Sequence, residues 1–134
     1  MKTVNNKGLL SIRIGDNNKM EVIFKPVDGN VWMDRNELCE LFGCYLKDIN
    51  EAIETVFKKE MFRVEDTCRY HIIAGGRRIC YDITDVNLTV IIALTFLMTT
   101  PQAKTLRQWF IEQMFKIKNL DIPFVNIGQN FMLN

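Results

Sequence analysis

The sequence predicts an α+β fold. Three observations support this prediction: two separate stretches in which apolar and polar residues alternate, a stretch of helical periodicity between them, and two further helical stretches after the second alternating one. Alternation with a period of two is typical of half-buried strands, whereas apolar residues three and four positions apart are typical of helices. Strands that follow one another across short turns indicate hairpins rather than a parallel sheet.

Length and composition suit one globular domain. The chain has 134 residues, of which 48% are hydrophobic, and seven glycines, so it can build one modest core. The longest apolar run, residues 88–98, is shorter than the ~20 residues of a membrane helix, and Thr89 and Thr95 interrupt it. We therefore expect a buried helix there and no membrane partner. No signal-like segment opens the chain, so we expect a cytoplasmic location.

Residues 1–33 are expected to form a β-hairpin followed by a short strand. The turn sequence GDNN at residues 15–18 separates two alternating stretches. Their apolar residues are Leu10, Ile12 and Ile14 before the turn, and Met20, Val22 and Phe24 after it. A second turn signal at residues 26–30 precedes Val31-Trp32-Met33, which we predict to be a short strand that leads into the helices.

Residues 34–60 have the pattern of two short helices joined by a sharp turn. Asp34 and Glu37 have the spacing of a capping box, and Gly43 suits a left-handed turn at the end of the first helix. We expect the second helix over residues 45–59. The small residue Cys39 and the anchor Ile49 allow close packing, and the rest of the apolar face is Leu38, Phe42 and Ala52. This is the pattern of a helix-turn-helix, whose second helix enters a DNA major groove, and also of a helical corner used only for packing.

Residues 61–83 are predicted to form a second hairpin. Its strands are expected over residues 67–73 and 77–83, on either side of Ala74-Gly75-Gly76. A hairpin directly after a helix-turn-helix is the order of a winged helix. Asp82, Thr84 and Asp85 are the candidate caps for the apolar helix that follows, which we expect to end near Thr100.

Residues 84–120 are predicted to be a helical pair, whose second helix starts at Pro101 and reaches roughly Ile117. The apolar residues of this last helix cover more than one face, and the tail, residues 121–134, is also apolar. We expect a homodimer through this helix and the tail, with packing of the tail on its own domain as the alternative. Trp32 and Trp109 are expected in the core or in an interface. Residues 1–120 thus form one winged-helix-like domain, with an amino-terminal β-hairpin and two carboxy-terminal helices, followed by the apolar tail.

The residue inventory argues against catalysis and cofactors. One histidine and one serine, Ser11 on an expected strand, do not make a nucleophile and base pair. The four cysteines lack the paired spacing of a zinc site, and we expect reduced, mostly buried thiols. A metal held by Cys68, Cys80 and His71 is the weaker alternative. We therefore predict no enzyme, no metal and no cofactor.

Several short elements occur in a characteristic order. They are Glu21-Val22 with Val31-Trp32-Met33, then Leu38-x-Glu40-Leu41-Phe42, Ile49, Tyr81 with Ile83, Val90-Ile91-Ile92-Ala93 and Arg107-x-Trp109. Together they resemble the amino-terminal half of the virulence-associated RhuM proteins of bacteria, over about residues 20–115. The resemblance implies a DNA-binding protein with a role like that of a transcription factor; it does not imply catalysis. This chain is shorter than the typical member, and its residues 95–100 are apolar or neutral where the relatives carry basic residues.

The expected DNA contacts lie on the second helix of the pair and on basic residues elsewhere. The amino-terminal part of a recognition helix enters the groove, and Asn pairs with adenine. Tyr45, Lys47 and Asn50 are therefore expected near bases; a solvated helix face, with Tyr45 partly buried, is the alternative. The expected phosphate contacts are Arg69, Arg77 and Arg78 on the hairpin, and Lys104 and Arg107 on the last helix.

Charge is the main objection to DNA binding. The net charge is only +1, and residues 33–60 contain four basic and seven acidic side chains. Neutralisation of phosphates by Lys and Arg supplies most of the non-specific affinity of a DNA-binding protein. The alternative function is therefore a protein-interaction module on a winged-helix scaffold that no longer binds DNA.

Overall fold

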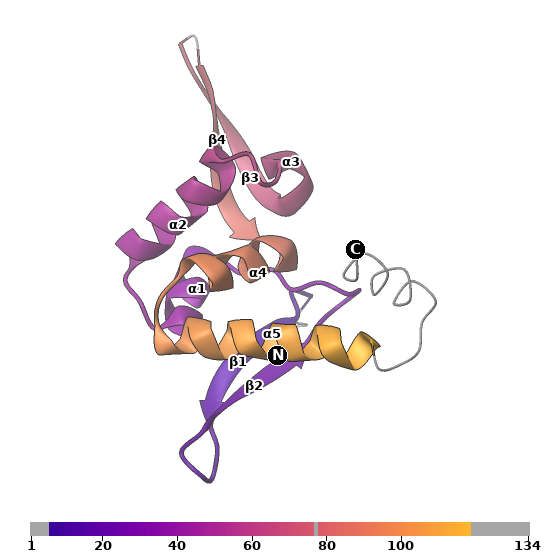
Figure 1. The fold of residues 1–134 in the computed structure, drawn as a ribbon. Helices are drawn as coiled ribbons and strands as arrows, with labels where there is room; N and C mark the ends of the chain where they lie inside the picture. The colour runs from indigo at the N-terminus through magenta and orange to yellow at the C-terminus, as the bar shows by residue number, and fades with distance from the viewer. Residues whose placement is uncertain (1–5, 77, 119–134) are drawn as a thin grey trace, which may run out of the picture.

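The computed structural model describes residues 6–76 and 78–118. The elements, in chain order, are β1 (Leu9–Ile14), β2 (Met20–Lys25), α1 (Arg35–Phe42), α2 (Leu46–Lys58), α3 (Val64–Thr67), β3 (Cys68–Gly75), β4 (Arg78–Val86), α4 (Leu88–Leu97) and α5 (Pro101–Lys118) (Figure 1). The described chain is thus a mixed α+β fold with two small antiparallel hairpins and five helices, which confirms the predicted class.

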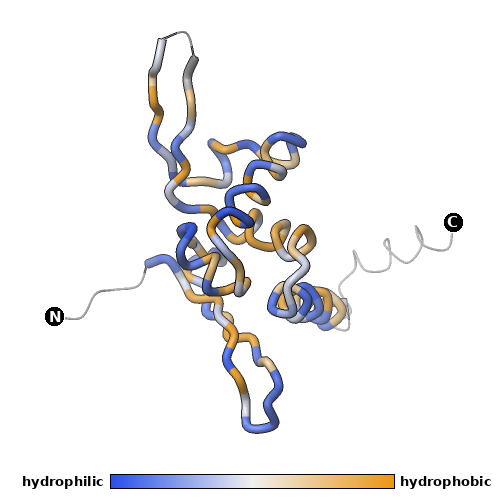
Figure 2. Tube along the Cα trace, turned by 90° about the vertical axis from the view of Figure 1, so that its left-hand side faces the viewer, coloured by the Kyte–Doolittle hydropathy of each residue, from blue (hydrophilic) through white to orange (hydrophobic). Residues whose placement is uncertain are grey.

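Two hairpins leave the helical body in opposite directions (Figures 1 and 2). In the first, Leu9 of β1 pairs with Lys25 of β2. In the second, Gly75 of β3 pairs with Arg78 of β4, and the register shifts between Arg69 and Tyr70. Both hairpins were predicted, but the strands of the second are longer than expected, and the single turn α3 that precedes it was not predicted.

The helix pair is built as its capping signals predict. Asp34 Oδ1 accepts a hydrogen bond from the Glu37 N–H at 2.8 Å, and Glu37 Oε1 accepts one from the Asp34 N–H at 2.9 Å. Gly43 ends α1 with φ 63°, in the left-handed region that glycine adopts without strain. The predicted apolar face is confirmed, because Leu38, Phe42, Ile49 and Ala52 are all buried.

The core lies around α4, which packs against α2 and α5 (Figure 1). Val90, Ile91 and Leu94 of α4 are completely buried. The predicted packing role of Trp109 is confirmed on α5, where its ring meets Phe24 of β2 edge to face, with 5.4 Å between centroids. Among the described residues, no helix is both long enough and apolar enough to cross a membrane.

The last helix buries its apolar stripe only along its first part. Ala103 and Leu106 are buried, whereas Met114 and Ile117 near its end are 64% and 45% exposed. The apolar tail, residues 121–134, and the interface predicted for it lie outside the described residues.

Two local predictions are wrong. Val31-Trp32-Met33 is not a strand: Met33 forms an isolated bridge with Val86, at N–O distances of 3.0 and 2.9 Å. The cap of α4 is Asn87, whose side chain accepts from the Val90 N–H, and not Asp82, Thr84 or Asp85. The reason is that β4 continues to Val86, so these three residues remain in the strand, and α4 itself ends at Leu97 rather than near Thr100.

Candidate nucleic-acid interface

The start of α2 presents large side chains to solvent. Tyr45 is 82% exposed and Leu46 is 47% exposed, and both Lys47 and Asn50 are exposed. The alternative of a partly buried Tyr45 is therefore wrong. The Tyr45 N–H donates to Asp48 Oδ2 at 3.3 Å, which fixes the first turn of the helix. The Tyr45 ring is thus exposed at a fixed helix end, where a partner surface could contact it.

Three of the acidic residues in the helix pair lie at the amino-terminal ends of its helices. Asp34 and Glu37 form the capping box of α1, and Asp48 caps the first turn of α2. The positive ends of the helix dipoles compensate charges at such positions. When these three capping residues are set aside, residues 33–60 contain as many carboxylates as cations. The carboxylates are Glu40, Glu51, Glu54 and Glu60, and the cations are Arg35, Lys47, Lys58 and Lys59. Outside its capping positions, the helix pair is therefore closer to neutral than the residue count indicates.

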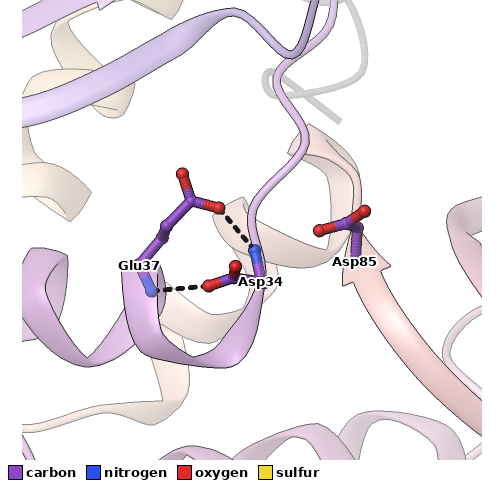
Figure 3. A group of neighbouring side chains, drawn as sticks. All are labelled: Asp34, Glu37 and Asp85. Carbon is purple, nitrogen blue, oxygen red and sulfur yellow. Dashed lines mark hydrogen bonds between the residues drawn. The ribbon is translucent and has the colours of Figure 1, made fainter.

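Three carboxylates meet where the hairpin β3–β4 returns to the body (Figure 3). Asp34, Glu37 and Asp85 bring oxygens within 4.8 Å of one another. Lys7 Nζ lies 2.6 Å from Glu37 and 3.2 Å from Asp85. Burial alone lowers the pKa of Lys7, but the hydrogen bonds and charges of Glu37 and Asp85 outweigh it and raise the pKa. A capping box and an ammonium group thus explain this cluster without a metal ion.

The outer part of the hairpin β3–β4, described over residues 71–76 and 78–82, stands clear of the body, and we call it the arm (Figure 2). Ile72 and Ile73 are 61% and 54% exposed. Because neighbouring strand residues point to opposite faces, both faces of the arm expose apolar side chains. Arg78 begins β4, and Arg77 lies outside the described residues.

The arm is anchored at its base. The Arg69 guanidinium lies 4.5 Å from the ring centroid of Trp32, and its Nη1 lies 3.8 Å from Asp85 Oδ2. The Tyr81 hydroxyl donates to Glu65 of α3 at 3.0 Å. Arg69 therefore has structural partners in addition to its expected role as a phosphate contact.

Arg107 and Lys104, both expected as phosphate contacts on α5, have different surroundings. The half-buried Arg107 donates from Nη1 to the carbonyl oxygens of Thr95 at 2.6 Å and Met98 at 3.4 Å. These carbonyls belong to the carboxyl end of α4, where a cation is favourable. Arg107 therefore caps α4 and has structural partners in addition to its expected role as a phosphate contact, whereas Lys104 is exposed.

The cysteines are free, and their distribution corrects the expectation of mostly buried thiols. Only Cys68 is buried, Cys39 and Cys44 are half-buried, and Cys80 is exposed. Burial raises the pKa of Cys44 to about 11, so this thiol is not activated. Cys68 and Cys80 do not face each other, because Cys68 pairs with Val86 at the base of the hairpin and Cys80 pairs with Ile73 in the arm.

A cleft of about 420 Å³ lies between α1, α2 and β4. Two cations line it, Arg35 from the first turn of α1 and Lys58 from the last turn of α2. Neither residue was expected to contact DNA. In the sequence, Arg35 differs from its neighbours only by its positive charge in the first turn of a helix. A cation is unfavourable at that position because the amino-terminal end of the helix dipole is also positive, so a role other than helix stability is indicated.

Comparison with known proteins gives no relative: no family model, curated protein or solved structure matches this chain.

Proposed function

We propose that this chain binds duplex DNA as a winged helix-turn-helix protein and serves as a transcriptional regulator. The observation that carries the proposal is the exposed start of α2, where Tyr45, Lys47 and Asn50 follow directly on the left-handed turn at Gly43. The amino-terminal residues of a recognition helix are the ones that reach base edges in the major groove. The resemblance to RhuM proteins, which includes Leu38-x-Glu40-Leu41-Phe42 and Ile49 of the helix pair, supports the same function.

The second hairpin is the wing in this proposal. The carboxyl end of α2 lies near the base of the arm (Figure 1), so a duplex laid along α2 extends toward it. Between Arg69 and Cys80 the sequence has three arginines, Arg69, Arg77 and Arg78, and no carboxylate. A cationic wing compensates for the nearly neutral helix pair, because phosphate contacts supply affinity and position while base contacts supply specificity.

We propose a homodimer that places two such surfaces on one DNA. The exposed Met114 and Ile117 at the end of α5 supply apolar surface for it. Two-fold symmetric dimers of this kind read two half-sites about one helical turn apart.

A protein-interaction module is the second candidate. One observation favours it: Ile72 and Ile73 expose apolar surface on both faces of the arm, which a protein partner buries more readily than a phosphate backbone does. In this case DNA affinity is absent at all salt concentrations.

The test is fluorescence anisotropy of random-sequence duplex DNA across a salt series. We expect wild-type affinity to fall with a slope in log K against log salt of about −0.9 for each phosphate neutralised. Arg77→Glu with Arg78→Glu removes the binding. The matched control is Lys19→Glu with Lys25→Glu, which changes the net charge equally at exposed positions of the opposite hairpin.

Two results would contradict DNA binding through the wing. One is the absence of binding by the wild type at about 50 mM salt, where electrostatic affinity is high. The other is an equal loss in both charge-reversed proteins, which would indicate a response to net charge alone.

A further inference from the structure

Arg35 has an unusual environment for an arginine. It is half-buried, and its Nη1 is shielded from solvent without a hydrogen-bond partner. In the part of the chain that the structure describes, no carboxylate lies within ion-pair distance of it. A shielded guanidinium nitrogen without a partner destabilises a folded protein, and native structures contain few such groups. The charge of Arg35 is therefore not neutralised by a carboxylate of the described residues.

The cleft that Arg35 lines contains both apolar and cationic side chains, a composition that suits an anion. Phe57 and Ile83 are among its apolar lining residues, and Lys58 brings a second cation from a different helix. Lys58 is exposed and has no ion pair within the described ranges. Glu54 is the one carboxylate among the described lining residues, so the cations outnumber it by two to one.

The position of the cleft fits the proposed DNA surface. Asn50, an expected base contact, also lines it. Side chains next to a base-reading residue commonly hold the adjacent backbone phosphate, which sets the register of the helix in the groove. Arginine suits this task because its planar fork can donate two parallel hydrogen bonds to phosphate oxygens.

We infer that the cleft between α1, α2 and β4 holds one backbone phosphate of bound duplex DNA, with Arg35 and Lys58 as its donors. This inference rests on the proposed DNA binding. It adds two contact residues to that proposal. It also adds a phosphate contact that holds the duplex in place between the start of α2 and the arm.

The experiment compares Arg35→Gln and Lys58→Gln with wild type in the salt series on duplex DNA. Each variant is expected to lower the magnitude of the salt slope by about 0.9, the value for one lost phosphate contact. The control is Arg13→Gln on the amino-terminal hairpin, where the exposed Arg13 pairs with Glu21 at 3.0 Å; its slope should equal that of the wild type. Thermal unfolding of Arg35→Gln should not begin earlier than in wild type, because the change removes an unpaired shielded cation.

The outcomes separate the two proposals. Wild-type protein that binds no duplex DNA overturns both. Wild-type binding with unchanged slopes in Arg35→Gln and Lys58→Gln overturns the phosphate site and leaves the DNA-binding proposal standing. An equal loss in Arg13→Gln also overturns the site. If Arg35→Gln does not fold, Lys58→Gln decides alone, since its exposed position tolerates the change and an unchanged slope there refutes the inference.

Discussion

Replacement of Arg107 by methionine tests whether this residue is a structural cap. The variant keeps an unbranched apolar stem but removes the Nη1 donor that lies 2.6 Å from the Thr95 oxygen. A hydrogen bond from a charged donor contributes about 1.5–3 kcal/mol, and a cation at a helix carboxyl end adds about 0.3–1 kcal/mol. The contact to Met98 at 3.4 Å is too long to add much. We therefore expect the free energy of unfolding to fall by about 2–3 kcal/mol, or about 8–12 °C in Tm for a domain of this size.

The assay is urea unfolding followed by far-ultraviolet circular dichroism. Lys104→Met is the matched control, since it removes an exposed cation one turn earlier on the same helix. Its stability should stay within about 0.5 kcal/mol of wild type, while its DNA affinity decreases. The capping role would be refuted if Arg107→Met also unfolded within about 0.5 kcal/mol of wild type with an unchanged dependence on urea.

Three further results follow from the structure. Asp34→Ala removes the acceptor of the Glu37 N–H and should lower the free energy of urea unfolding by about 1 kcal/mol, whereas Asp34→Asn, which keeps a capping oxygen, should lose much less; equal losses would contradict the cap. Glu54→Gln removes the carboxylate beside the proposed phosphate and should tighten duplex DNA binding several-fold in anisotropy, so weaker binding would count against the site. Iodoacetamide with peptide mapping should label the exposed Cys80 first. The pKa of Cys44 is raised to about 11, so about one thiol in a thousand is ionised at about pH 8. The rate of Cys44 labelling should therefore rise about tenfold for each pH unit. Rapid labelling of Cys44 at about pH 8 would disprove the effect of burial on its pKa.

The helix pair could be predicted because its signals are local. The capping box of Asp34 and Glu37 and the left-handed Gly43 act within one turn of the chain, and all three have the predicted geometry. The same holds for both hairpins, whose turns lie between strands that are neighbours in sequence.

The missed features depend on contacts between distant residues. Asn87 caps α4 because β4 continues to pair with β3 as far as Val86, and no local pattern fixes where that pairing ends. The role of Arg107 depends on the end of α4 lying beside it, twelve residues earlier in the chain. For the same reason the cleft around Arg35 could not be foreseen, since its walls come from α1, α2 and β4.

The backbone pairing of Met33 with Val86 affects how this chain can change in length. Met33 precedes the cap of α1, and Val86 precedes the cap of α4. The Asn30 side chain joins the same point, where it accepts from the N–H groups of Val31 and Leu88, both at 2.9 Å. One added residue near this junction would displace the helix pair, the arm and the central helix together. Insertions should therefore be tolerated at the turn of residues 15–18 and rejected at residues 30–34 and 86–88, which a scan of single-residue insertions can map.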